Sequence, residues 1–276
     1  MTLSLDGPLL LAGAGKMGGA MLSGWLKRGL DPAHVIVQDP GPPAEVAQLL
    51  KDHGILSSSS IADALEAAPA VIVVAVKPQA MDSVFPVLAR LAGPRTLVLS
   101  IAAGKTIQSF ERHLGAGAAV VRAMPNTPAA IGRGITVCVA NRHVSSGQRA
   151  LATSLLEAVS EVGWVDDEAL MDAVTAVSGS GPAYVFLLAE VLAAAGVAQG
   201  LDPELSARLA RVTVSGSGEL LRQSSESASQ LRQNVTSPGG TTAAALSVLM
   251  REGSGLPDLM AEAIAAATKR GRELAG

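Results

Sequence analysis

Two short stretches of this chain combine residue types that could bind a charged ligand. The first is the run SPGGTT at residues 237–242, where a proline and two glycines precede two threonines and an apolar segment. Proline restricts its own φ, and glycine adopts backbone conformations that other residues resist. A helix beginning at the threonines would present free N–H groups and hydroxyls to a carboxylate or a phosphate. The alternative is an N-capped turn that binds nothing.

The second stretch is the G-x-G-x-x-G pattern GAGKMG at residues 13–18. It follows the apolar run Leu9–Ala12 and opens a helix-compatible segment at residues 17–26. In this context glycines let the backbone approach a pyrophosphate and let the helix pack closely on its strand. The alternative is a glycine-rich turn in another kind of α/β protein. We predict a dinucleotide-binding loop formed by Gly13, Gly15, Lys16, Met17 and Gly18.

Asp39 bears on the choice of cofactor, because it ends the next apolar run at residues 35–37. A carboxylate in this position can bind the ribose 2′-hydroxyl of NAD and would repel a 2′-phosphate. No arginine or lysine lies between Arg28 and Lys51 to bind such a phosphate. We therefore expect NAD(P)H with a preference for NADH, although Asp39 could also be a turn residue beside Pro40.

Strands alternating with helices predict a Rossmann-type, doubly wound and mostly parallel sheet in the N-terminal half. Ligands of such sheets bind at the carboxyl ends of the strands, where three loops lie in this sequence. Taken singly, Lys77 could be a solvated charge and Asn126 a turn cap, but together the loops favour a ligand cleft. The further strands are expected at residues 71–76, 97–101, 120–123 and 135–140, with helices at 81–91 and 145–158. The loops are AVKP at 75–78, SIAAG at 100–104 and MPNTP at 124–128.

Composition and charge exclude several other classes of protein. The chain has 276 residues, of which 49% are hydrophobic and 2% aromatic, so its core is built from aliphatic side chains. A net charge of −3 offers no basic face for nucleic acid. The start lacks the basic segment of a secretory signal, and we expect no uninterrupted apolar stretch long enough to span a bilayer. We therefore expect a cytoplasmic protein without a membrane partner. The single cysteine, Cys138, is interpreted as a small core residue.

The C-terminal half is predicted to be helical. An apolar stripe at residues 170–177 has helical spacing, and the run SGSGP at 178–182 is expected to interrupt this helix. Residues 183–195 are expected to form the next helix, which is apolar on nearly every side. Pro182 suits the first turn of that helix. A small helical domain would bury such a helix poorly on its own, so we expect a homodimer. The domain boundaries are placed at 1–166, dinucleotide-binding, and 167–276, dimerisation and substrate-binding.

Six blocks of this sequence resemble the pyrroline-5-carboxylate reductases, in that family's order and over nearly the whole chain. The blocks are GAGKMG (13–18), AVKP (75–78), SIAAG (100–104), RAMPNTP (122–128), AVSGSGPAYVF (176–186) and NVTSPGGTT (234–242). The resemblance implies reduction of 1-pyrroline-5-carboxylate to L-proline by NADH or NADPH. It also implies an obligate dimer with interlocked helical domains, often arranged in larger rings. The chain departs from the family's pattern at Gln233, where an aspartate is frequent, and lacks the proline common upstream, which bears on the mobility of the 237–242 loop.

The resemblance also assigns roles to individual residues. The 237–242 loop is expected to receive the substrate carboxylate, and Thr242 is expected to be the catalytic residue that bonds near the ring nitrogen. No metal is expected. The substrate-binding set is Ser237, Pro238, Gly239, Gly240, Thr241 and Asn126. The remaining cofactor-binding set is Val76, Lys77, Pro78, Ala102, Ala103, Gly104 and Asn234, together with Asp39, which is predicted from its place after the second strand.

Imine reduction is consistent with the residue types present. An imine nitrogen is basic enough to be partly protonated near neutral pH, so a strong protein acid is not required. None of the four histidines lies in a motif, namely His34, His53, His113 and His143. Two alternatives remain. A β-hydroxyacid dehydrogenase needs a catalytic lysine on the first helix of its C-terminal domain, and residues 183–195 contain none. A non-catalytic dinucleotide sensor would not need the 122–128 and 237–242 loops.

Overall fold

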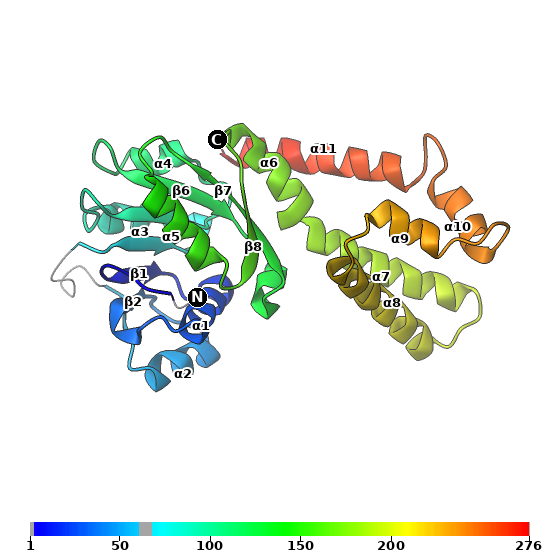
Figure 1. Ribbon diagram of the computed structural model, residues 1–276, viewed down its shortest axis with the longest axis horizontal. Helices are drawn as coiled ribbons and strands as arrows, with labels where there is room; N and C mark the ends of the chain where they lie inside the picture. The colour runs from blue at the N-terminus through cyan, green and yellow to red at the C-terminus, as the bar shows by residue number, and fades with distance from the viewer. Residues whose placement is uncertain (1–2, 61–67, 276) are drawn as a thin grey trace. The chain divides into compact units, whose positions relative to one another are not determined.

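The computed structural model of the protein describes residues 3–60 and 68–275 (Figure 1). Its contacts divide the chain into two compact units. The sheet unit comprises Met1–Gly179 and Thr268–Gly276, and the helical unit comprises Ser180–Ala267. The predicted functional boundary between residues 166 and 167 stays a prediction.

The sheet unit is built on an eight-stranded sheet in the order β3-β2-β1-β4-β5-β6-β7-β8. Neighbouring strands are parallel except for the antiparallel pair β6 and β7. The predicted doubly wound, mostly parallel sheet is therefore confirmed. The strands are β1 Leu9–Ala12, β2 Val35–Gln38, β3 Leu56–Ser58, β4 Val71–Val74, β5 Leu97–Ser100, β6 Ala119–Met124, β7 Gly134–Ala140 and β8 Ser160–Trp164.

Both faces of the sheet are covered by helices, which explains why its strands β1 and β4 are apolar throughout. In β1 the side chains of Leu9 and Leu11 join one core, and those of Leu10 and Ala12 join the core on the opposite face. The first core is closed by α1 Lys16–Lys27, α2 Ala44–Asp52 and α5 Ser146–Leu156, and the second by α3 Met81–Ala89 and α4 Ile107–Glu111. Short 3₁₀ segments are η1 Pro32–His34, η2 Pro78–Ala80, η3 Thr127–Ile131 and η4 Glu168–Leu170.

Two helix starts show how local sequence fixes element boundaries. Ser145 and Gln148 form a reciprocal capping box at the start of α5, in which the Gln148 N–H donates to Ser145 Oγ at 3.2 Å. Asp202 caps the first helical turn after α7 by accepting from the N–H groups of Glu204 and Leu205, both at 3.0 Å. Side-chain oxygens at these positions satisfy helix N–H groups that have no partner within the helix.

The helical unit contains α7 Gly181–Ala198, α8 Pro203–Gln223, α9 Ala228–Asn234, α10 Thr241–Leu249 and most of α11 Leu256–Ala275. Helices α7 and α8 approach closely where Gly196 faces Ser206, because a Cβ on the glycine would overlap the Ser206 hydroxyl. That hydroxyl donates to the carbonyl of Ala193 at 2.6 Å. Among described residues of α7, none is buried in the single chain, and Phe186 is 68% exposed.

The predicted interruption at residues 178–182 is only a local change of helix type. A four-residue helix α6 Met171–Val174 passes into a π-helix at Thr175–Gly179, and a bend at Ser180 precedes α7. Apart from the bend at Ser180 the chain is helical from Glu168 to Ala198, and this run is long and apolar enough to cross a membrane by length and composition alone. The expectation that no segment reaches that length was wrong, because the small residues at 178–181 do not stop the helix.

Candidate functional site

The glycine loop at residues 13–18 has the geometry that its pattern predicts. Gly13 has a φ of +91° and its N–H donates to the carbonyl of Gln38 at 2.8 Å. A Cβ on Gly13 would lie 2.6 Å from the carbonyl oxygen of Ala75, and a Cβ on Gly18 would overlap the carbonyl of Gly13. A Cβ on Gly15, in contrast, would meet no atom of the chain within 4 Å. Packing thus requires glycine at 13 and 18, whereas Gly15 leaves room for a ligand.

The start of α1 is suited to an anion. The N-cap residue is Gly15, which has no side chain, and no side-chain hydrogen bond caps the helix. Lys16 is exposed at the first helical position, and Met17 packs partly against the core. Uncapped N–H groups and the helix dipole favour a phosphate at such a helix start. These residues fit the pyrophosphate of a dinucleotide.

Asp39 lies at the end of β2, directly against the glycine loop. Its Oδ2 accepts from the Ala14 N–H at 2.6 Å, and its Oδ1 accepts from the Gly41 N–H at 2.8 Å. The second bond makes Asp39 a turn residue, and the first orients its carboxylate beside the loop. Each carboxylate oxygen retains a further lone pair for a ribose hydroxyl. The two interpretations of Asp39 are therefore compatible.

The loops at residues 75–78 and 100–104 follow β4 and β5 and leave the sheet at the same edge as the glycine loop. The N–H of Ala75 donates to the Ala12 carbonyl at 2.7 Å, and that of Ile101 donates to the Val74 carbonyl at 3.0 Å. In the 100–104 loop Gly104 has a φ of +72°, a left-handed conformation that glycine adopts without strain. Residues predicted to bind the cofactor thus share the carboxyl edge of adjacent strands. They are half-buried Val76, exposed Lys77, Pro78 at the start of η2, buried Ala102 and exposed Ala103.

Asn126 follows β6 at the same edge but has a structural role there. Its Oδ1 accepts from the N–H of Ile135 at 2.9 Å, which fixes the turn that leads into β7. Gly132, with a φ of +67°, ends the intervening η3 segment. This bond uses the carbonyl end of the Asn126 amide, and the substrate role of Asn126 stays a prediction.

Arg122, in the same sequence block, received no role from the sequence. Its side chain is 7% exposed within β6, and its Nη1 lies 2.8 Å from Glu168 Oε1. The same carboxylate oxygen accepts from the N–H of Ile107, the first residue of α4, at 2.9 Å. An arginine inside an otherwise apolar strand was the available signal, but its partner lies 46 residues away and could not be identified from spacing.

The 237–242 loop belongs to the helical unit and forms a tight turn before α10. Gly239 has a φ of +68°, and the N–H of Gly240 donates to the Ser237 carbonyl at 3.0 Å. Helix α10 starts at Thr241 with Gly240 as its N-cap and no side-chain cap, and ligand binding at this turn stays a prediction. Thr242 is half-buried, and Pro238 is exposed in the turn. The first helical turn leaves N–H groups and a hydroxyl that could receive a carboxylate.

Asn234 ends α9 and is already bonded within the helical unit. Its Nδ2 donates to Glu226 Oε2 at 3.1 Å, and its Oδ1 accepts from Gln230 Nε2 at 2.9 Å. Contact with a cofactor would exchange these exposed bonds for new ones. The predicted cofactor role of Asn234 therefore stays a prediction.

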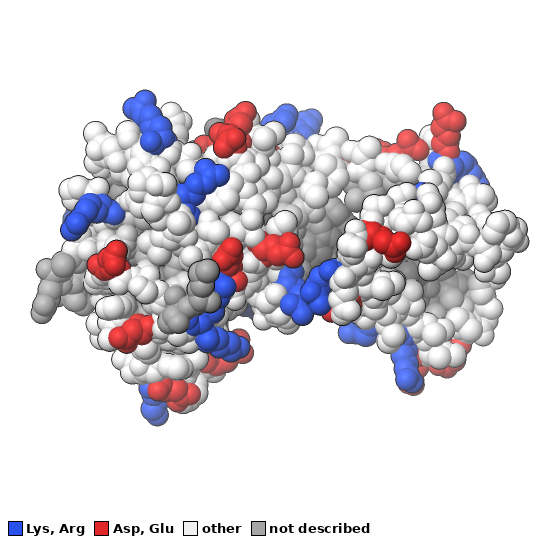
Figure 2. Space-filling model, in the orientation of Figure 1, with Lys and Arg blue, Asp and Glu red and all other residues white. Residues whose placement is uncertain are grey.

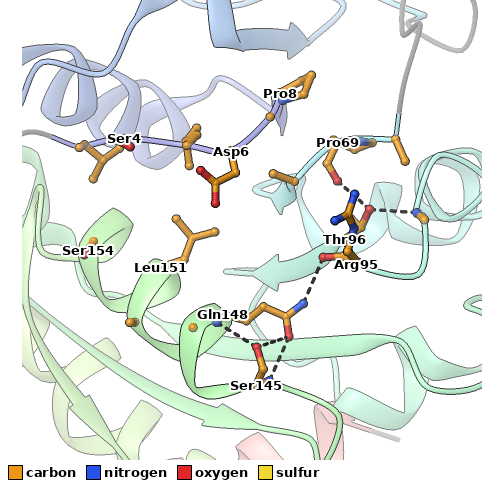
Figure 3. A pocket seen from close by; sticks show the side chains of 18 of the residues that line it. Ser4, Asp6, Pro8, Pro69, Arg95, Thr96, Ser145, Gln148, Leu151 and Ser154 are labelled. Carbon is orange, nitrogen blue, oxygen red and sulfur yellow. Dashed lines mark hydrogen bonds between the residues drawn. The ribbon is translucent and has the colours of Figure 1, made fainter.

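A groove of about 1300 Å³ lies at the opposite, amino edge of the sheet (Figure 3). It is lined by Pro8 before β1, Ala70 before β4 and Thr96 before β5. Several of its polar groups already bond to protein: Gln148 Nε2 donates to the Arg95 carbonyl at 3.2 Å, and Thr96 Oγ1 donates to the Pro69 carbonyl at 2.6 Å. None of the predicted site residues lines this groove.

Charge is dispersed on the surface. On the face drawn in Figure 2, lysine and arginine side chains lie singly or in small groups among acidic ones. Among the described residues no group of three or more histidine, cysteine, aspartate or glutamate side chains could hold a metal ion.

A Rossmann-type sheet with this glycine loop, followed by a helical region, defines the chain as an NAD(P)H-dependent oxidoreductase. Residues 9–104 match the family model described as NADP oxidoreductase, coenzyme F420-dependent, and residues 168–274 match that for pyrroline-5-carboxylate reductase dimerisation. Pyrroline-5-carboxylate reductase from Pseudomonas aeruginosa is 41% identical over 95% of both chains, and that from Mycobacterium leprae 40% identical over 99% of this chain and 98% of the relative. The chain belongs to the pyrroline-5-carboxylate reductase family.

Solved structures agree with this assignment. A pyrroline-5-carboxylate reductase from Coxiella burnetii superposes with a TM-score of 0.89 at 34% identity, covering 98% of this chain and 99% of that one. The Plasmodium falciparum enzyme, solved with NADP bound, superposes with a TM-score of 0.80 at 29% identity over 98% and 99% of the two chains.

Proposed function

We propose that this protein reduces the C=N bond of 1-pyrroline-5-carboxylate with a hydride from NAD(P)H, giving L-proline, the last step of proline biosynthesis. The observation that carries the proposal is the likeness to pyrroline-5-carboxylate reductases over nearly the whole chain. The uncapped start of α10 supports it, because a substrate carboxylate needs an anion pocket. When bound, the reduced nicotinamide supplies the hydride.

The chain's own residues orient the two reactants. The start of α1 and the loops after β4 and β5 hold the dinucleotide. The substrate carboxylate binds at the start of α10, through Ser237, Pro238, Gly239, Gly240 and Thr241. The Thr242 hydroxyl bonds at the ring nitrogen, and the Asn126 amide contacts the substrate. Holding reactants in a near-attack geometry lowers the barrier by roughly 7–11 kcal/mol, so orientation alone accounts for much of the rate.

NADH is the preferred reductant in this proposal. The Asp39 carboxylate is fixed beside the glycine loop by the Ala14 N–H, where it would bond a ribose hydroxyl and repel a 2′-phosphate. A relative solved with NADP bound shows that the family includes a protein that binds the phosphorylated cofactor, so the choice depends on individual side chains.

In this proposal the protein acts as a homodimer, and dimers assemble further into a ring. The proposed location of the protein is the cytoplasm. Large apolar side chains of α7 are 42–68% exposed in the single chain, far more than an isolated soluble domain would leave in contact with water. The match to a dimerisation family model over residues 168–274 supports burial against a second copy. Light scattering of the detergent-free protein measures the assembly, and a monomer would contradict it.

One assay separates this function from its alternatives. The purified protein is mixed with pyrroline-5-carboxylate and each reduced nucleotide, and loss of nucleotide absorbance is followed. The proposal predicts turnover with formation of proline. Binding of nucleotide without turnover would favour a dinucleotide sensor, and oxidation of a β-hydroxyacid with NAD would favour a hydroxyacid dehydrogenase.

A further inference from the structure

The part-buried ion pair between Arg122 and Glu168 joins three elements of the sheet unit. Arg122 lies on β6, Glu168 opens the helical run 168–198, and the N–H of Ile107 at the start of α4 donates to the same Glu168 oxygen. The arginine side chain is 7% exposed and the glutamate 29% exposed. A guanidinium removed from water needs its carboxylate partner, so loss of either member leaves an unbalanced charge in a largely apolar region.

The elements that this ion pair joins lie next to the 100–104 loop. Helix α4 begins three residues after Gly104, and a Cβ on Gly104 would lie 3.9 Å from the carbonyl oxygen of Leu274 in α11. Helix α11 in turn lies close to α6, because a Cβ on Gly271 would lie 3.0 Å from Asp172 Oδ1. Within the sheet unit, the 100–104 loop is thus close to the last residues of α11, and these are close to α6.

Hydride transfer requires a defined position of the nicotinamide, which the 100–104 loop helps to hold in the proposed function. This loop, the start of α4, Arg122 and Glu168 all belong to the sheet unit. Misplacement of about 1 Å far from the reacting atoms can lower a rate roughly a hundredfold. A fixed ion pair at the junction of loop and helical run would limit such misplacement.

We propose that Arg122 and Glu168 are positioning residues for the reduction: their ion pair holds the 100–104 cofactor loop and the start of the helical run 168–198 in one arrangement. The inference rests on the proposed function, since it concerns the rate of the same reaction. Neither residue needs to touch substrate or cofactor. The pair acts through the backbone N–H of Ile107 and through the base of the helical run.

The test compares Arg122→Met, Glu168→Gln and the double variant with the wild-type holoenzyme. Arg270→Met is the matched control, because Arg270 forms an exposed ion pair with Glu273 on α11 at 2.9 Å. The readouts are kcat/KM for the imine per folded protein, the Kd of NADH without imine, the deuterium isotope effect with 4-deuterated NADH, and the melting temperature. Arg122→Lys tests rescue, since lysine restores the charge without the planar fork.

The expected result is a fall in kcat/KM of about tenfold or more in both single variants, a larger isotope effect, and an NADH Kd within about threefold of wild type. The double variant should lose no more than the worse single variant, and Arg122→Lys should recover part of the rate. A rate within about twofold of wild type, or losses in the two singles that multiply in the double variant, would overturn the inference.

A purely structural pair would give a different pattern. It would lower the melting temperature and the folded fraction while leaving kcat/KM per folded protein and the isotope effect unchanged, which also overturns the inference. If Arg122→Met does not fold, Glu168→Gln and Arg122→Lys carry the same test. Failure of the proposed function is distinct, because the wild-type protein itself would then not reduce the imine.

Discussion

In the proposed function, Thr242 is the side chain on which the chemistry of the substrate site most directly depends. It is half-buried at the second position of α10, and the helix start beside it has no other side-chain cap. Thr242→Val keeps the shape and removes the hydroxyl that would bond the ring nitrogen. We expect kcat/KM for the imine to fall about tenfold or more, equivalent to roughly 1.4 kcal/mol of barrier, with the Kd of NADH unchanged. Steady-state kinetics equal to wild type would show that the hydroxyl has no such role.

We propose that Asp39 decides between the two nicotinamide cofactors through its charge. Asp39→Asn keeps an oxygen to accept from the Ala14 N–H, so the glycine loop is preserved, and removes the negative charge. Repulsion of a phosphate about 4 Å away is worth roughly 1–4 kcal/mol, depending on the dielectric. We therefore expect the ratio of kcat/KM for NADPH to that for NADH to rise about tenfold. Rates of nucleotide oxidation at saturating imine measure it, and a wild-type preference for NADPH would contradict the assigned role.

Cys138 is an unreactive core residue, as its sequence context predicted. Burial raises the pKa of its thiol from 9.0 to about 12, and the positive charge of Arg149 opposes this to a smaller extent. Because the folded pKa is the higher one, the stabilisation is complete below pH 9 and declines as the pH rises toward 12. The free energy of unfolding should decline more steeply over this range in wild type than in Cys138→Ala. Native protein at neutral pH should not react with a thiol reagent until it unfolds.

At the scale of single elements, the turn before α10 requires glycine at one position. Gly239 has a φ of +68°, and a Cβ added there would meet no atom within 4 Å, so strain rather than crowding would oppose a side chain. Gly239→Ala should lower stability by roughly 1–2 kcal/mol, or distort the loop and raise KM for the imine. Gly216→Ala in α8, which has equal space and no positive φ, is the control. Thermal melting and imine kinetics of the two variants distinguish backbone strain from general sensitivity to alanine.

Elements whose boundaries depend on local chemistry could be predicted from the sequence. The run Leu9–Ala12 and the glycines that follow it are found where predicted, because a buried strand must be apolar and a tight turn must contain glycine. The strand Leu56–Ser58 was missed, since it is short, polar and held only by pairing with β2. The π-helix at Thr175–Gly179 was missed because its small residues are typical of a break.

The site itself was predicted as a set of loops, and its long-range bonds were not. Sequence spacing identifies the carboxyl ends of neighbouring strands, so the glycine loop and Asp39 could be associated by their positions along the chain alone. Spacing does not identify the partner of Arg122, because the ion pair with Glu168 depends on how β6 and the helical run pack. Asn126 was recognised as a polar loop residue, but its bond to Ile135 depends on the turn into β7.

At the scale of the whole molecule, the exposed apolar surface of the helical unit needs a partner. Phe186 and Leu187 on α7 are 68% and 55% exposed in the single chain, and burying a side chain of this size is worth roughly 1.5–3 kcal/mol. Two copies that cover these faces would therefore gain stability together, and the helical run 168–198 would be apolar because it is an interface rather than a membrane span.

Phe186→Asp tests this interpretation, because a charge at a buried interface is strongly unfavourable. We expect the variant to dissociate or to aggregate, with a lower melting temperature and loss of imine reduction. Leu56→Asp on β3 is the control: Leu56 is 52% exposed in the sheet unit, so the same change should leave assembly and activity nearly intact. A Phe186→Asp protein that stays dimeric and active would exclude this face of α7 from the interface. A wild-type protein recovered only with membranes would instead assign the helical run to a bilayer.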